Sequence, residues 1–340
     1  MRTLGVAIGA FLLASGQVGA SRTIPVVPKL PVFEGQAVVL SPEQLAALAR
    51  GDPVVQLLNA KDGRVVAAFG IIAIKTPRKA FVSGLVNFPQ SLRAQGIQNF
   101  GVIKVPATAA DFGAANITAS DAAALQKCHA GKCEFKLPAS DMARAKALLD
   151  GGADGLTKVA AYARRRGAEY VSDYRTRGNA AMVVYDDYGK GSVRASDAFA
   201  ALLGASSYLA ENAPGLQRYL QQVPRGRPAD ASEAIYWSVE TLKELRPTFT
   251  INEIVVSSPT ETPGMTVAVT KQLYSDHYFE GMLDERFIVD RREGGSYAML
   301  LRQYRFDNLP GGVLNIRGRA KSMMRDRMDA ELRRMQGGTR

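Results

Sequence analysis

The stretch VVAAFGIIAIKTPRKAF, residues 65–81, does most to decide the fold. Residues 65–74 are apolar or small and rich in β-branched side chains, which favours a buried strand. Thr76 and Pro77 follow, and these are residue types suited to an N-cap and to the first helical position. The strand should therefore run directly into a helix.

The sequence on the N-terminal side supplies a partner for this strand. Residues 54–59 form a second apolar, β-branched run, and AKDG at residues 60–63 joins the two runs. Asp-Gly between such runs is a strong hairpin signal. Upstream again, SPEQ at residues 41–44 is a typical helix start, and the three prolines of residues 21–40 predict an extended leader.

A second β-rich region begins near residue 235. The hydrophobic period becomes two, and turn-rich joints separate five predicted strands, at 235–240, 248–256, 266–274, 279–290 and 297–304. Short connections imply antiparallel neighbours. A long amphipathic helix is expected after them, over residues 313–335.

These two regions resemble the START-like, helix-grip superfamily (SRPBCC type), in which a curved antiparallel sheet wraps around a C-terminal helix and encloses a cavity. Residues 65–81 look like that family's strand entering its first helix, and residues 235–335 look like its closing strands and gripping helix. The resemblance implies an α+β fold. Residues 41–106 and 233–336 would form the helix-grip domain, and residues 107–232 would be a mainly helical insertion.

Composition narrows the function classes. The chain has 340 residues with 46% hydrophobic and 22% charged residues, which is too apolar for a disordered protein. Two Cys and two His exclude a disulfide-dense scaffold and a four-Cys zinc site. Neither a P-loop nor a G-x-G-x-x-G motif occurs, so we expect no cofactor and no metal.

The N-terminus reads as a secretory signal of a bacterial protein. Met1 and Arg2 give a short basic region, residues 4–13 are apolar, and small residues precede a cleavage point after Ala20. An uncleaved N-terminal anchor is the alternative. The expected location is the periplasm, where Cys128 and Cys133 should form a local disulfide.

The chain has 43 Lys and Arg against 32 Asp and Glu, and this excess of positive charge is concentrated near the C-terminus. The predicted C-terminal helix carries basic residues opposite its apolar side, among them Arg317, Lys321 and Arg325. In an exported protein this pattern favours an anionic membrane surface or an acidic partner over nucleic acid. A solvated helix face explains the same pattern.

Ligand-binding residues are expected on the last strand and on the C-terminal helix. The strand candidates are Tyr297, Met299 and Leu301 on one face and Arg302 and Tyr304 on the other. The helix candidates are Ile316, Met324 and Met328. Methionines give an adaptable apolar surface, although they also fill ordinary cores. Arg302 could hold an anionic head group or simply pack along its stem.

Catalytic candidates are few. His277 stands beside Asp276 and near Glu280 in YSDHYFE at residues 274–280, which permits acid/base roles, although a structural histidine is the commoner case. We therefore rank three hypotheses. The first is an exported protein that holds a lipid or other apolar small molecule between sheet and C-terminal helix. The second is a START-like cyclase or hydrolase using His277 with Asp276 or Glu280, and the third is an envelope interaction module that docks through residues 107–232.

Overall fold

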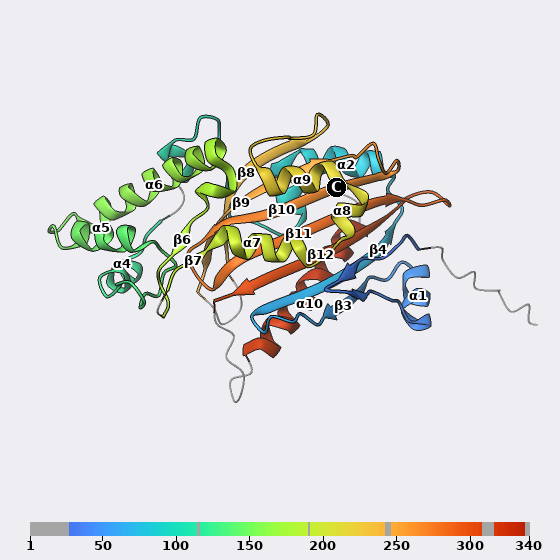
Figure 1. The fold of residues 1–340 in the computed structure, drawn as a ribbon, viewed down its shortest axis with the longest axis horizontal. Helices are drawn as coiled ribbons and strands as arrows, with labels where there is room; N and C mark the ends of the chain where they lie inside the picture. The colour runs from blue at the N-terminus through green and yellow to red at the C-terminus, as the bar shows by residue number, and fades with distance from the viewer. Residues whose placement is uncertain (1–26, 114–115, 190, 242–245, 308–315, 337–340) are drawn as a thin grey trace, which may run out of the picture.

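A computed structural model describes residues 27–336, except 114–115, 190, 242–245 and 308–315. The predicted signal peptide, residues 1–20, lies outside the described residues. The centre of the molecule is an eight-stranded antiparallel sheet in the order β3-β4-β12-β11-β10-β9-β8-β5 (Figure 1). Its strands are β3 (Val54–Leu58), β4 (Val65–Ile74), β5 (Phe100–Val102), β8 (Ser232–Glu240), β9 (Thr248–Ser257), β10 (Met265–Ser275), β11 (Phe279–Asp290) and β12 (Ser296–Phe306).

The strands form for the reasons that the sequence indicates. β3 and β4 make the expected hairpin, with Val54 opposite Ile71, and β4 leads into α2 (Arg78–Val86) and α3 (Phe88–Ala94). β8 to β12 form an antiparallel meander because their connections are short. The last strand returns to the first long one, since Tyr297 of β12 pairs with Ala73 of β4. The chain is thus α+β with a large antiparallel sheet and a C-terminal helix.

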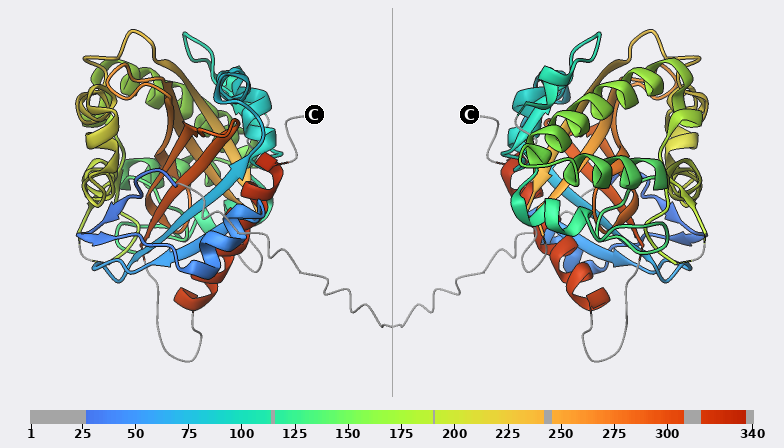
Figure 2. Two further views of the ribbon diagram at one scale, coloured as in Figure 1. Left: turned by 90° about the vertical axis from the view of Figure 1, so that its right-hand side faces the viewer. Right: turned by 90° about the vertical axis from the view of Figure 1, so that its left-hand side faces the viewer.

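Helices cover both faces of the sheet (Figures 1 and 2). α2, α3 and α10 (Ile316–Gln336) lie on one face. α6 (Gly155–Arg177), α7 (Ala195–Gly204), α8 (Tyr208–Asn212) and α9 (Pro214–Gln222) lie on the other. Because successive strand residues point to opposite faces, a strand covered on both sides is apolar at nearly every position. β4 shows this, with nine of its ten residues buried.

α10 packs closely on β4. Met324, Met328 and Leu332 are buried against Ile72 and other residues of the same face. Gly70 of β4 allows this approach, because a Cβ placed there would lie 2.6 Å from the Met328 sulfur. Residues 313–315, expected to begin this helix, lie outside the described residues.

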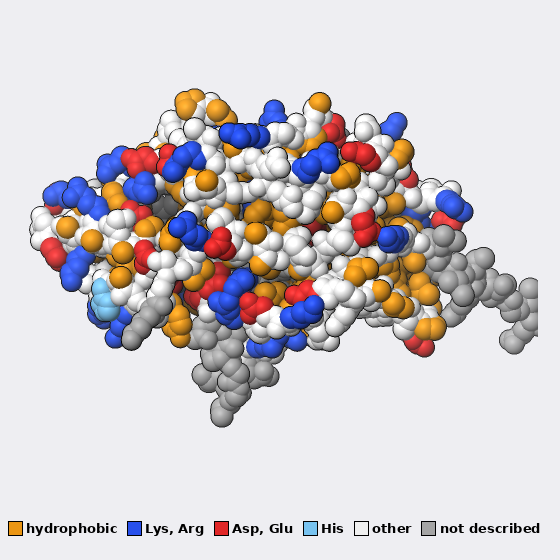
Figure 3. Space-filling view, viewed as in Figure 1, with side chains coloured by type: hydrophobic (Ala, Val, Ile, Leu, Met, Phe, Trp, Pro, Cys, Tyr) orange, Lys and Arg blue, Asp and Glu red, His pale blue; other side chains and the backbone are white. Residues whose placement is uncertain are grey.

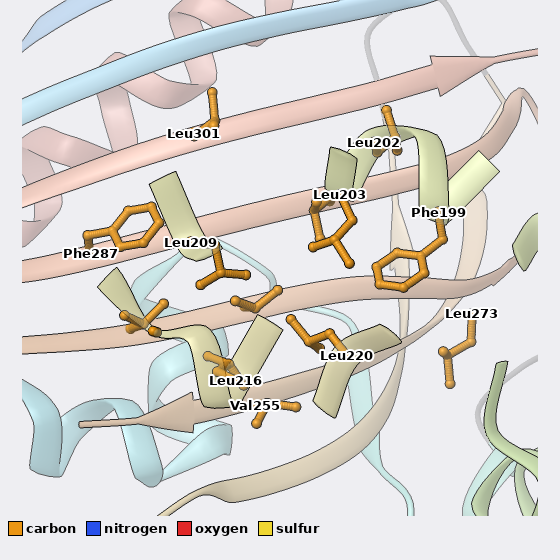
Figure 4. Packing of buried hydrophobic residues seen from close by; sticks show 14 of the residues in the cluster. Phe199, Leu202, Leu203, Leu209, Leu216, Leu220, Val255, Leu273, Phe287 and Leu301 are labelled. Carbon is orange, nitrogen blue, oxygen red and sulfur yellow. The ribbon is translucent and has the colours of Figure 1, made fainter. Parts of the chain in front are cut away.

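The opposite face carries a larger core. Phe199, Leu202, Leu203, Leu209, Leu216 and Leu220 of α7–α9 point toward Val255, Leu273, Phe287 and Leu301 of the sheet (Figure 4). Part of residues 107–232 is therefore joined to the sheet by a shared core.

The rest of the helical block stands at one end of the sheet (Figure 1). It contains η1 (Ala109–Phe112), α4 (Ala119–Leu125), α5 (Ala139–Leu149) and the N-terminal half of α6. Its small core includes Leu125, Phe135 and Met142. The disulfide Cys128–Cys133, expected from the sequence, is present here and buries Cys128 in the same cluster.

The remaining elements are short. α1 (Pro42–Ala49) begins at Ser41, whose side chain accepts from the Gln44 amide as the SPEQ motif predicts. The others are β1 (Val32–Phe33), β2 (Gln36–Ala37), η2 (Gly178–Ala181), β6 (Val184–Tyr185) and β7 (Val193–Arg194). Within the described ranges, no helix has the length and apolar character needed to cross a membrane.

Candidate functional site

A cavity of about 860 Å³ lies between the helical block and the end of the sheet, on the face opposite α10. Its walls come from α4, α5, α6, the segment 135–138, β9 and the turn after β10. A space of this size is typical of small-molecule sites, which cover about 300–1,000 Å³. It is the main candidate for a functional site.

Aromatic side chains form much of the wall. Phe112, Phe135, Tyr170, Phe249 and Tyr274 all line the cavity. The ring of Tyr274 lies 6.4 Å from that of Tyr170 and 6.3 Å from that of Phe249, between ring centres. Leu125, Val159 and Ile251 add aliphatic surface. A ligand in this space would bury apolar surface, which is the main source of affinity in such sites.

Two of the tyrosines are fixed by hydrogen bonds. The Tyr170 hydroxyl donates to the Leu273 carbonyl at 2.6 Å and accepts from the Val183 amide at 3.3 Å. The Tyr162 hydroxyl donates to Asp141 at 2.6 Å, and burial together with that carboxylate raises the pKa of Tyr162 to about 12. Both phenols therefore stay protonated at neutral pH.

Charged side chains on α6 line the cavity, and most of them form ion pairs. Arg166 Nε lies 3.2 Å from Asp141 Oδ1, and Arg177 Nη2 lies 2.8 Å from Asp173 Oδ2. Arg164 also lines the cavity and forms no ion pair with any described residue. The paired charges stabilise the helix surface and are already compensated, whereas Arg164 is not.

Asp276 and His277 lie together in the cavity wall, at the turn between β10 and β11. Asp276 Oδ1 accepts a hydrogen bond from the Phe249 amide at 2.9 Å and lies 2.8 Å from His277 Nδ1. The Asp276 amide donates to the Phe249 carbonyl at 3.0 Å, so the turn is fastened to β9. Burial raises the pKa of the Asp276 carboxyl above its usual range, and the neighbouring imidazole opposes this.

The His277 ring is enclosed. Its centre is 4.7 Å from that of Phe135, only 5% of the residue is exposed, and Nε2 is buried without a partner among the described residues. Ser275 is the neighbouring hydroxyl, and it donates to the His277 carbonyl at 2.7 Å instead of to the ring. A nucleophile activated by this histidine is therefore not assembled from Ser275.

Glu280 does not join His277 and Asp276. Its carboxylate accepts from Arg305 Nε at 2.8 Å and from Arg64 Nη1 at 3.1 Å, and it is buried at the junction of β4, β11 and β12. Two arginines hold this group, so it serves as a structural ion pair.

The large cavity does not lie between the sheet and α10, where a ligand is expected from the sequence. Met324 and Met328 of α10 belong to the same buried apolar cluster as Ala298 and Leu300. A pocket described on this side, beside α2 and α3, measures only about 40 Å³. The sequence could not show on which side of the sheet the large cavity lies.

The residues predicted to bind ligand are also divided between the two faces. Tyr297, Met299 and Leu301 belong to the core under the helical block, whereas Tyr304, Met324 and Met328 belong to the core under α10. Ile316 is half-buried at the start of α10. None of the eight predicted residues lines the large cavity.

Arg302 is held by acidic partners. Its guanidinium donates to Asp284 and to Glu331 of α10, the latter at 2.7 Å, and Arg286 Nη2 lies 2.8 Å from Asp284. All four side chains are buried. They form a neutral cluster between sheet and helix, so Arg302 has no charge left over for an anionic head group.

The proposed membrane-facing residues Arg317, Lys321 and Arg325 lie on α10, where Arg317 and Lys321 are half-buried and Arg325 is exposed. Arg325 Nε lies 3.3 Å from Asp326, and elsewhere on the helix Arg327 and Arg333 pair with Glu240 and Asp329. On the face drawn in Figure 3, away from α10, basic and acidic side chains are also mixed. Contact with an anionic surface stays a prediction.

Several cavity residues were not singled out as ligand contacts from the sequence, chiefly Phe135, Tyr162, Tyr170, Phe249 and Tyr274. Tyr162, Tyr170 and Tyr174 do recur at helical spacing, which was a usable signal for one aromatic face of α6. That Phe249 and Tyr274 meet this face depends on how the helical block folds back onto the sheet.

No protein-family model matches the sequence, and no curated protein matches it significantly. Among solved structures, the chain is similar to the crystal structure of the di-domain ARO/CYC protein BexL from the BE-7585A biosynthetic pathway. The match has 9% sequence identity, covers 86% of this chain and 76% of that one, and has a TM-score of 0.24. Because the TM-score is this low, the match carries no argument about fold or function.

Proposed function

We propose that this chain is an exported helix-grip protein that binds an apolar small molecule in the cavity between the helical block and the sheet. The observation that carries the proposal is the 860 Å³ cavity with its aromatic wall. The binding site of the first hypothesis thereby moves from the α10 side of the sheet to the opposite side.

The helix-grip assignment is supported by chain order and packing. A long strand leads directly into two short helices, a five-strand meander follows, and the closing helix lies across β3, β4 and β12. Residues 107–232 depart from the simple plan, because they cover the second face of the sheet and enclose the cavity.

The cavity wall explains why an apolar ligand is favoured. The wall aromatics are held in place by contacts outside the cavity, such as the stacking of Phe249 on Trp237 at 6.0 Å between ring centres. A preformed apolar space gains affinity from desolvation without the cost of ordering its own side chains.

Organic extraction tests the proposal. The protein is secreted to the periplasm of a bacterial host, purified and extracted, and the extract is analysed by mass spectrometry. We expect a stoichiometric apolar molecule in the wild type and in Ala161→Trp, and less of it in Ala163→Trp. Ala163 lines the cavity, whereas Ala161 is equally exposed on the same helix and does not line it. Equal yields from both variants would contradict the proposal.

The enzymatic alternative is favoured by one contact only, the 2.8 Å approach of His277 Nδ1 to Asp276. That arrangement is found where a carboxylate orients a general base. Against it stand the enclosed Nε2 atom and the engagement of both Ser275 and Glu280 in structural contacts. Binding is therefore the better-supported function.

A further inference from the structure

The end of the cavity at the turn between β10 and β11 presents one carboxylate oxygen that no described residue satisfies. Asp276 Oδ1 is occupied by the Phe249 amide and lies beside His277 Nδ1. Oδ2 makes no hydrogen bond within the described part of the chain, although Asp276 lines the cavity and its side chain is 17% exposed. One oxygen of this carboxylate is thus left for a ligand.

Aromatic rings surround the same end. Tyr274 precedes Asp276 by two residues, and Phe249 is bonded to Asp276 through both of its backbone groups. The ring centre of Tyr274 lies 6.4 Å from that of Tyr170 and 6.3 Å from that of Phe249. The faces of such rings attract cations, and the attraction grows when the cation is withdrawn from water.

Most of the arginines that line the cavity form ion pairs with carboxylates. Arg166 and Arg177 pair with Asp141 and Asp173, and Arg246 Nη2 lies 2.9 Å from Glu134. The imidazole of His277 lies beside Asp276, with Nδ1 2.8 Å from Asp276 Oδ1. Arg164 stands on α6 without an ion pair in the described part of the chain.

Building on the proposed function, we infer that the ligand is an organic cation, an apolar or aromatic molecule whose ammonium group donates to Asp276 Oδ2 and lies against the rings of Tyr274 and Phe249. The carboxylate supplies a charge-assisted hydrogen bond, and the rings receive the remaining surface of the cation. Arg164 supports the opposite possibility, because a guanidinium in the cavity wall that has no ion pair with a described residue would favour an anionic ligand.

Three probes with the same apolar body separate these possibilities: naphthylmethylamine, naphthylmethanol and naphthylacetate. Binding to the full chain is measured by calorimetry at pH 7. We expect the amine to bind about tenfold more tightly than the alcohol, and the acetate most weakly. This ranking needs no variant, so it can be read even if substitutions disturb folding.

Two variants then test whether Asp276 is the source of the preference for the amine. Asp276→Asn should remove the preference for the amine and leave binding of the alcohol within about twofold, because the amide oxygen can still accept from the Phe249 N–H. Asp173→Asn is the matched control, since Asp173 lines the cavity and pairs with Arg177, and it should keep the preference.

The outcomes are distinguishable. If the alcohol binds as tightly as the amine, or the acetate binds best, the inference is wrong and cavity binding still stands. If Asp173→Asn rather than Asp276→Asn removes the preference, the inference is also wrong. If none of the three probes binds, both the inference and the proposed function fail.

Discussion

Glu285 is a buried carboxyl with no compensating partner in the described structure. It lies on β11 between Leu283 and Phe287, on the face covered by α7–α9, and is 1% exposed. Neither of its carboxylate oxygens has a hydrogen-bond partner among the described residues. Burial, with a smaller effect of Asp284, raises the pKa of Glu285 to about 8.

This residue predicts a dependence of stability on pH. In the unfolded chain the carboxyl ionises near 4.5, whereas in the folded protein it keeps its proton up to about 8. Between these values the unfolded state holds fewer protons, so the free energy of unfolding should fall as pH rises, by about 1.4 kcal/mol per pH unit. Glu285→Gln cannot ionise and should lack this contribution.

Urea unfolding at pH 5 and pH 8 tests this pH dependence of the free energy of unfolding. We expect Glu285→Gln to match the wild type at pH 5 and to exceed it by several kcal/mol at pH 8. Glu293→Gln, on an exposed turn residue, is the control and should show little difference at either pH. A Glu285→Gln difference that is the same at both pH values would contradict the assignment.

At the scale of elements, the contact of α10 with β4 shows how the closing helix is held. Gly70 leaves room for Met328, and the cluster of Asp284, Arg286, Arg302 and Glu331 joins the same helix to β11 and β12. The apolar contacts supply the stabilisation, because a buried ion cluster is costly to desolvate and is expected to fix register more than to add free energy.

A double-mutant cycle tests the Gly70 contact. Gly70→Ala should destabilise by about 1–3 kcal/mol through overpacking, and Met328→Ala by about 2–5 kcal/mol through the cavity it leaves. Because the methyl group added by Gly70→Ala would occupy space freed at position 328, the double variant should lose less free energy of unfolding than the two single variants together. Free energies of unfolding that add within about 0.5 kcal/mol would show that the two residues do not compete for space.

The elements of the sheet could be predicted from the sequence, and their assembly could be predicted only in part. The Asp-Gly hairpin and the period-two strands after residue 235 are local signals, and the corresponding elements are present. A helix also follows Pro77, but its N-cap is Pro77 and not Thr76, and no side chain caps it. The Cys128–Cys133 disulfide could be predicted as well, because its two residues lie close together in the sequence.

The site could not be predicted, because it depends on contacts between distant segments. Both faces of β12 are apolar, so its pattern could not say which face meets α10 and which meets the helical block. Asp276 and His277 were singled out and do line the cavity, yet their aromatic surroundings come from α6 and β9. Glu280, near them in sequence, points to another junction.

For the whole molecule, the decisive feature is that helices lie on both sides of one sheet (Figure 2). α10 completes an apolar core on one side, while residues 107–232 both cover the second side and leave a cavity at its end. In the proposed function, core packing and ligand binding therefore fall to different faces. A destabilised α10 should weaken the fold without changing what the cavity selects.

Titration of a neutral apolar fluorophore, phenylnaphthylamine, into matched variants tests this division most directly. Ala163→Trp should weaken binding at least about tenfold, since the indole would occupy the cavity, whereas Ala161→Trp and Met324→Ala should bind as the wild type does. Unchanged affinity in Ala163→Trp, or loss of binding in a folded Met324→Ala, would place the ligand elsewhere and contradict the central claim.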